Sequence, residues 1–380
     1  MLIIKNGRVL DPLNRVDCVT DVAVEGGSIV RVGSADLPNP GDVVIDATGC
    51  IVTPGLIDHH THLYPLAKIG IPAEAVCFAS GVTTAVDAGS TGWATYASKR
   101  PFVQLSKLKI LAYLNVCTTG LDSLPVLENV DPRCWDEGRI RDCLSQYPDE
   151  LVGLKLRTSR SIVKELGYAP LRSAVKLAEK LDTHLMVHCT DPPGEFSELL
   201  DLLRPGDILT HMYMNQGPAL VENGRVIPAA LRARERGVLF EAADARMHFG
   251  LPVAKAAIRE GFYPDIVATD LTQQSMHLRP TSFNLAMQIS KYAALGIPVE
   301  AVIERCTAAP ARQLARLEQI GSLTVGHAAD IAIFKPVSQE NAFGDRPDGV
   351  TGQCLHVGSM LYQPMLTVKN GEMVYRSLLF

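Results

Sequence analysis

The sequence predicts an α/β protein in which a (β/α)8 TIM-like barrel is joined to a small β-sandwich domain built from both termini. The chain of 380 residues is long enough for a barrel of about 250 residues plus a smaller domain. Apolar segments alternate with helical patterns through the middle, and short strand patterns fill both ends. We expect residues 1–52 and 324–380 to form the sandwich and residues 53–323 to form the barrel.

Turn dipeptides separate short apolar segments at both ends of the chain. Asn6-Gly7 and Gly26-Gly27 do so near the N-terminus, and Asn370-Gly371 does so near the C-terminus. No linker rich in Ser or Gly separates the ends from the middle, so we expect the two parts to pack together. The strands expected here are 2–4, 22–24, 29–32, 43–45, 329–334, 366–368 and 373–375.

Eight apolar segments of the middle region are typical of parallel strands that are buried on both faces. Helical patterns lie between most of them, for example over 170–181 and 252–259. Eight strand–helix units predict a closed barrel. The expected strands are 52–57, 82–86, 110–114, 151–155, 185–188, 208–211, 238–242 and 266–270.

The composition is that of a globular enzyme-sized protein, with 47% hydrophobic and 20% charged residues and a formal net charge of −5. The pI near 6.1 gives no reason to expect nucleic acid or an anionic membrane as a partner. We expect a cytoplasmic protein, because the N-terminal sequence lacks a signal-peptide pattern and the nine cysteines are scattered. The expected partner is a small-molecule substrate, and barrels of this kind commonly form homo-oligomers.

The most informative motif is the pair His60 and His62, which follows an apolar segment. On a strand, side chains at i and i+2 point to the same face, so both imidazoles can converge on one metal ion. The pair is expected at the C-terminal end of the first barrel strand, where barrel enzymes place their chemistry. A single His-X-His pair also arises by chance or for packing, so the interpretation depends on further ligands.

Polar residues end four later apolar segments: Lys155, His188, His211 and Asp270. Each alone is more often a structural residue than a ligand. Because the C-terminal ends of barrel strands share one mouth, we expect all four near His60 and His62. Six such residues at one mouth predict a metal site.

Lys155 is the unusual member of this set, because an ammonium group repels metal cations. One interpretation is a structural lysine that pairs with Asp270. The other is chemical: burial lowers the pKa of a lysine, and the neutral amine can add carbon dioxide to form a carbamate. The two carbamate oxygens can then bridge two metals as a carboxylate does.

With these residues the chain resembles the amidohydrolase superfamily, in its binuclear branch with a carboxylated lysine on the fourth strand. The resemblance covers nearly the whole chain, including the split β-sandwich, and extends to residues 81–89 and 326–331. It implies two divalent metal ions, with zinc expected and manganese, iron or cobalt able to substitute. It implies that one ion is held by His60, His62, Lys155 and Asp270 and the other by carboxylated Lys155, His188 and His211.

Within the superfamily, residues 155–160 and 187–193 resemble an amidohydrolase/deacetylase subgroup often labelled dihydroorotase-like. Some of its members act on acetylated α-hydroxy acids. The resemblance implies a hydrolase that cleaves an amide or ester bond by attack of a metal-bridging hydroxide, with Asp270 as general base. The implied reaction is deacylation of a small carboxylate-bearing substrate, such as an N-acyl amino acid or an O-acetyl hydroxy acid.

Two further residues are candidate substrate contacts. Arg157 lies two residues beyond Lys155, so strand alternation points it into the same mouth, where it can grip a carboxylate. The alternative for Arg157 is an ion pair with an acid of the barrel rim. His248 follows the seventh strand and can hydrogen-bond the substrate, or it is a surface-loop histidine. His277 has weaker support, and His59 is expected to face away from His60.

Other functions stay open. A cyclic amidase resembling dihydroorotase or hydantoinase is the runner-up, although dihydroorotases usually carry an arginine where this chain has Tyr64. Deaminases of the mononuclear branch usually lack the lysine and carry a His-X-X-Glu motif, which this chain does not have. A catalytically inactive structural relative is a third alternative, disfavoured because all six ligand positions are filled.

Overall fold

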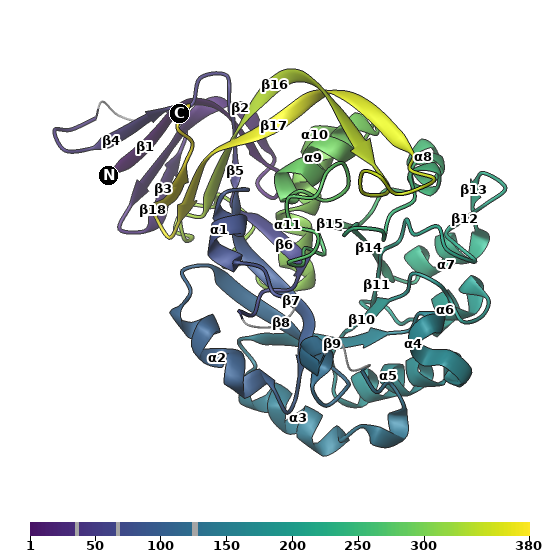
Figure 1. Ribbon diagram of the computed structural model, residues 1–380. Coiled ribbons are helices and arrows are strands. Elements are labelled where there is room, and N and C mark those ends of the chain that lie inside the picture. The colour runs from purple at the N-terminus through teal and green to yellow at the C-terminus, as the bar shows by residue number, and fades with distance from the viewer. Residues whose placement is uncertain (35–37, 66–68, 124–127) are drawn as a thin grey trace.

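The computed structural model describes residues 1–34, 38–65, 69–123 and 128–380 (Figure 1). Eight parallel strands form one sheet in the order β15-β14-β11-β10-β9-β8-β7-β6, which confirms the predicted number of barrel strands. Of the first segment, expected over 52–57, residues 52–54 belong instead to β5 (Ile51–Pro54) of the other sheet. Helices surround this sheet in Figure 1, as the alternation of the sequence predicts. The strands are β6 (Leu56–Thr61), β7 (Val82–Gly92), β8 (Lys109–Asn115), β9 (Leu151–Arg157), β10 (Leu185–His188), β11 (Ile208–Thr210), β14 (Leu239–Ala243) and β15 (Ile266–Ala268).

Hydrogen bonds between the first and last strands close this sheet into a barrel. The Asp58 carboxylate accepts bonds from the backbone N–H and the hydroxyl of Thr269, at 3.1 and 2.6 Å. The backbone N–H of Asp270 donates to the carbonyl of His60 at 2.7 Å, and that of His62 donates to Leu271 at 3.0 Å. The seam of the barrel therefore runs through residues predicted to bind metal.

Apolar side chains fill the barrel below its mouth. Ile57, Val86, Leu111 and Met186 form one buried cluster with Ala311, which lies on α11 (Ala308–Gln313). Strands that alternate inward and outward side chains produce such an interior. The α11 helix covers this end of the barrel, so the open end is the one that carries the predicted ligands.

The strands of both termini form a second sheet, in the order β18-β17-β16-β5-β1-β2-β3 with β4 paired to β1. Buried side chains from its N-terminal and C-terminal strands share one core, and Figure 1 shows both chain ends on it. The domain boundaries stay a prediction. The strands are β1 (Leu2–Asp11), β2 (Val16–Glu25), β3 (Ser28–Val32), β4 (Val43–Asp46), β5 (Ile51–Pro54), β16 (Ile331–Gly344), β17 (Leu355–Lys369) and β18 (Glu372–Arg376).

The hairpin of β16 and β17 is much longer than the short strands predicted there, and it extends from the terminal sheet over α9 (Figure 1). Its β17 strand is tied to α9 by the backbone N–H of Tyr362, which donates to the Ser290 hydroxyl at 3.0 Å. Such docking on the barrel is a long-range contact that local patterns do not reveal.

The helix predicted over 170–181 is α5, and the one predicted over 252–259 is α8, so both are confirmed. Within the described residues, no helix combines the length and the apolar character that crossing a membrane requires. The remaining elements are α1 (Ala73–Phe78), α2 (Tyr96–Leu105), η1 (Gly120–Ser123), η2 (Pro132–Cys134), α3 (Glu137–Gln146), α4 (Arg160–Val163), η3 (Lys164–Leu166), α5 (Ala169–Lys180), α6 (Phe196–Leu202), the hairpin β12 (Val221–Glu222) and β13 (Arg225–Val226), α7 (Pro228–Glu235), α8 (Leu251–Arg259), α9 (Leu285–Ala294) and α10 (Val299–Arg305).

Candidate metal centre

The six predicted ligands converge at the open end of the barrel. They come from the ends of five strands, and each is at most 7% exposed. Five of them line a pocket of about 190 Å³ at this end, and the sixth, His211, lies beneath it against His188. The predicted ligands are His60 and His62 (β6 and the residues after it), Lys155 (β9), His188 (β10), His211 (after β11) and Asp270 (after β15).

His60, His62 and Asp270 form a first group that is suited to hold a metal ion, with ligand atoms within 4.8 Å of one another. The Asp270 Oδ1 atom lies 3.4 Å from His60 Nε2 and 3.2 Å from His62 Nε2. Burial by itself raises the pKa of the Asp270 carboxyl. The neighbouring His60, His248 and His62 outweigh burial and hold this pKa well below its usual range.

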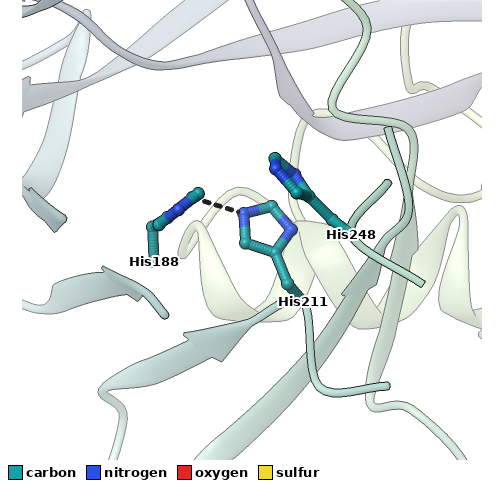
Figure 2. Close-up of side chains that lie close together, drawn as sticks. All are labelled: His188, His211 and His248. Carbon is teal, nitrogen blue, oxygen red and sulfur yellow. Dashed lines mark hydrogen bonds between the residues drawn. The ribbon is translucent and has the colours of Figure 1, made fainter. Parts of the chain in front are cut away.

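A second group consists of His188, His211 and His248, and Figure 2 shows their three rings close together. The Nε2 atom of His211 lies 2.8 Å from His188 Nδ1. His248 Nδ1 donates to Asp270 Oδ2 at 2.8 Å, so Asp270 connects the two groups. We predicted His248 as a substrate contact. Its place beside His188 and His211 makes it a candidate ligand as well.

The histidine rings present unprotonated nitrogens to the centre, which is the form that binds metal. His60 Nδ1 donates to the Glu241 carboxylate at 2.8 Å, and His211 Nδ1 donates to the Ala243 carbonyl at 2.6 Å. Their Nε2 atoms are therefore free of hydrogen. Burial lowers the pKa of His60 to about 4 and that of His211 well below its usual range, so both rings are neutral. This donor set fits divalent metal ions.

Lys155 lies in the same centre without a counter-ion. Its side chain is 1% exposed, and its Nζ atom lies 3.4 Å from His60 Nε2 and 3.2 Å from Met186 Sδ. Among the residues that the structure describes, no carboxylate oxygen lies within 4.0 Å of this nitrogen, so an ion pair with Asp270 is absent. Burial lowers the pKa of Lys155 to about 8. These surroundings fit a lysine that becomes a carbamate.

Two ligands leave their strands in an unusual backbone conformation. His211 has φ 64° and Asp270 has φ 54°, the left-handed region in which residues with a side chain are uncommon. Such strain costs of order 1–3 kcal/mol per residue and persists where the surrounding structure enforces it. The predicted strands included both residues, but β11 ends at Thr210 and β15 at Ala268. Strand alternation therefore does not set their direction.

Glu241 in β14 contacts the candidate metal centre, and our sequence interpretation missed it. It is fully buried and binds His60 with one oxygen and His59 with the other, at 2.8 and 2.5 Å. Burial favours a raised pKa for Glu241, but the two histidines lower it below its usual range, so the carboxylate is ionised. The sequence signal that could have revealed it is a single acidic residue inside the apolar segment Leu239–Ala243.

The expectation that His59 faces away from His60 is wrong, because both rings bind the same carboxylate. The pairing of β6 with β7 shifts register between Asp58 and Thr61, which breaks the regular alternation of side chains there. His59 also lies 2.8 Å from the amide oxygen of Gln313 on α11. It therefore joins the metal centre to the packed end of the barrel.

The predicted substrate contacts differ in their surroundings. His248 and Arg157 both line the pocket, whereas His277 does not. Arg157 donates through Nη1 to the buried carboxylate of Glu128 at 2.6 Å. An ion pair with an acid of the barrel rim is the alternative that we stated for Arg157. His277 packs its ring against Phe283. A role for Arg157 or His248 in substrate binding stays a prediction.

Comparisons with known proteins agree with this geometry. The model of the amidohydrolase family matches residues 51–356. A deacetylase of Agrobacterium fabrum is 34% identical over 329 residues, which cover 84% of this chain and 79% of that protein. A deacetylase of Brucella anthropi is 32% identical over 95% of this chain and 89% of its own length. A crystal structure described as a dihydroorotase has a TM-score of 0.89 at 30% identity and covers 99% of this chain and 100% of that one.

Proposed function

Because this chain belongs to the amidohydrolase family and is a hydrolytic enzyme, we propose that it deacylates a small carboxylate-bearing ester or amide. The expected substrates are an N-acyl amino acid or an O-acetyl hydroxy acid. The observation that carries the proposal is the pair of ligand groups joined by Asp270 at the floor of one pocket. The similarity to two deacetylases supports removal of an acetyl group.

The residues fit two divalent ions, for which zinc is the expected metal. We assign His60, His62, carboxylated Lys155 and Asp270 to one ion and Lys155, His188 and His211 to the other, with His248 beside the second. When bound, two such ions lower the pKa of a water and polarise the carbonyl of the substrate. We also propose a cytoplasmic location, in which all nine free cysteines stay reduced.

Asp270 is the proposed general base. Its carboxyl is ionised, because its pKa lies well below the usual range, so it can accept a proton from the attacking water. His248 holds one of its oxygens by a bond of 2.8 Å and so fixes the orientation of the carboxylate. Asp270 then returns the proton to the leaving oxygen or nitrogen. The products are a carboxylic acid and an alcohol or amine.

A cyclic amidase is the second candidate, favoured by the structural similarity to a protein described as a dihydroorotase. One observation weighs against it. Tyr64 occupies the position where such enzymes usually carry a carboxylate-binding arginine, and it is fully buried and outside the pocket lining.

A hydrolysis screen separates these functions. The enzyme, purified with zinc and bicarbonate, would be incubated with N-acetyl amino acids, O-acetyl hydroxy acids and cyclic ureides. Release of acetate supports deacylation, ring opening alone supports the cyclic amidase, and hydrolysis of none of these overturns the proposal. Asp270→Asn should retain much of the bound zinc but lose at least about 100-fold in kcat, the lower range for general base catalysis. Wild-type kcat in a zinc-loaded variant would reject the role of Asp270.

A further inference from the structure

Two arginines occur in the described lining of the pocket, Arg157 and Arg246. An arginine side chain in a protein carries a positive charge and has only hydrogen-bond donors. A substrate carboxylate needs such a partner, because a carboxylate that leaves water must regain charge-assisted hydrogen bonds. The surroundings of the two guanidinium groups show which of them is available.

Arg157 already has a carboxylate partner. Glu128 accepts its hydrogen bond at 2.6 Å, and the Glu128 side chain is 2% exposed. In the described part of the chain, Arg157 is the partner of this acid, and the second Glu128 oxygen, Oε1, is buried without a hydrogen bond. Turning Arg157 toward a substrate would leave a buried charge uncompensated, which proteins avoid. The charge of Arg157 is thus neutralised within the protein.

Arg246 is in the opposite situation. It is exposed at the pocket, and no hydrogen bond or ion pair joins its guanidinium to any residue in the described ranges. A guanidinium has five N–H donors in a planar fork that matches a carboxylate. Arg246 therefore offers an uncompensated positive charge at the entrance to the metal centre.

An ion pair and hydrogen bonds of buried groups hold the loop that carries Arg246 in place. The Asp244 carboxylate is buried, forms an ion pair with Lys291 and accepts from the Tyr292 hydroxyl, which lies 2.9 and 3.0 Å from its two oxygens. The backbone N–H of Ala245 donates to the Thr269 carbonyl at 2.9 Å, and Ala245 has φ 38°. This anchoring fixes the backbone from which Arg246 projects.

The same loop links Arg246 to the reacting groups. The backbone N–H of His248 donates to the Asp244 carbonyl at 3.0 Å, and the His248 ring binds Asp270. Arg246 lies two residues before His248, and both line the same pocket. A small substrate in this pocket can therefore contact the metal centre through its acyl carbonyl and Arg246 through a carboxylate on its leaving group.

We propose that Arg246 is the residue that recognises the substrate carboxylate, while Arg157 stays paired with Glu128. The inference rests on the proposed deacylation and narrows its substrate class to acyl derivatives of small 2-hydroxy or 2-amino acids with a free carboxylate. Neutral analogues of the same shape lack the group that Arg246 binds, so they are the poorer substrates.

The test compares acetate release from O-acetyl-lactate with that from its methyl ester, which has no negative charge. In Arg246→Met, the ratio of kcat/KM for the acid to that for the ester should fall about 10- to 100-fold, mainly through KM. Arg246→Lys should restore part of this ratio. Lys255→Met is the matched control, because it removes an exposed charge of α8 outside the pocket lining and should leave the ratio unchanged.

Arg157→Met is the decisive comparison. If Arg157 only stabilises the protein through its ion pair with Glu128, its loss should change kcat/KM for the acid and for the ester by the same factor. A ratio that collapses in Arg157→Met and survives in Arg246→Met overturns the proposal. If the wild type releases acetate from neither of these compounds nor from N-acetyl amino acids, the proposed function fails, and binding of lactate measured by calorimetry then tests Arg246 alone. Equal lactate affinity of the wild type and Arg246→Met would reject the carboxylate site.

Discussion

At the scale of single residues, hydrogen bonds at the Nδ1 atoms of three histidines orient their rings in the candidate centre. Glu241 fixes His60, the Ala243 carbonyl fixes His211, and the Ser90 hydroxyl lies 2.8 Å from His62 Nδ1. The Ser90 hydroxyl in turn donates to Asp87, so the His62 ring donates to Ser90. Partners of this kind set the tautomer and the orientation of a ligand, and they raise its affinity for metal.

Glu241→Gln should weaken zinc binding about 10- to 100-fold, the usual effect of losing such a partner. His59 and His60 donate to different oxygens of Glu241, and an amide has only one oxygen that can accept. The dissociation constant for zinc, measured by competition with a chromogenic chelator, checks this. Glu235→Gln, which changes an exposed acid on α7, is the control. Unchanged zinc affinity in Glu241→Gln would show that its carboxylate is a packing feature only.

Carboxylation of Lys155 should depend on pH. Burial lowers the pKa of Lys155 to about 8, so the unreactive ammonium form dominates below this pH and the neutral amine dominates above it. After equilibration with carbon-13 bicarbonate and zinc, the carbamate NMR signal should be stronger at about pH 9 than at about pH 6. Lys155→Met should give no signal. A signal that persists in this variant would come from another lysine and contradict the assignment.

At the scale of elements, the ends of the barrel strands determine where the ligands stand. β7 ends in a glycine-containing stretch that leaves room for Lys155 of β9, which lies beyond β8 in the sheet. Gly89 has φ +84°, and a Cβ atom there would lie 2.6 Å from Lys155 Cγ and 2.7 Å from Lys155 Cβ. A residue without a side chain is therefore required beside the lysine, both for the backbone and for the space.

Gly89→Ala should displace Lys155 and lower both stability and metal content. The strained backbone and the overlap should together cost about 2–4 kcal/mol in the free energy of unfolding. Gly167→Ala is a matched control, since Gly167 has φ +54° and a Cβ atom added there would meet nothing within 4 Å. Urea denaturation and zinc analysis measure the difference. Equal losses in the two variants would show that contact with Lys155 has no effect.

At the scale of the whole molecule, the metal centre lies on the seam of the barrel. The first and last strands meet through Asp58 with Thr269 and through the backbone of Asp270 with His60. The ligands come from strands on both sides of this seam and from across the barrel. Ions bound there would connect parts of the chain that are far apart in sequence.

Removal of metal should therefore lower the thermal stability of the whole barrel. An ion that binds only the folded chain stabilises it by about 2.7 kcal/mol at 100 times its dissociation constant. The melting temperature, followed by calorimetry, should fall after chelation and recover when zinc is added back. His60→Ala should show a smaller response to zinc. An unchanged melting temperature after complete removal of the metal would contradict this coupling.

The fold class and the six candidate ligands could be predicted from local patterns in the sequence. Apolar strands alternating with helices, and polar residues such as His188 at strand ends, are local patterns that survive in the structure. The His-X-His spacing also related His60 to His62, although the irregular register of β6 brings His59 to the same carboxylate as His60. Local patterns sufficed because strand direction and burial are properties of short segments.

The groups that surround these candidate ligands became known only from the three-dimensional fold. His60 meets Glu241 across 181 residues of sequence, His248 joins His211, and Arg157 is neutralised by Glu128 while Arg246 stays open to the pocket. These relations follow from barrel closure, register shifts and left-handed strand ends. They arise between segments that are distant along the chain, so no periodicity within one segment encodes them.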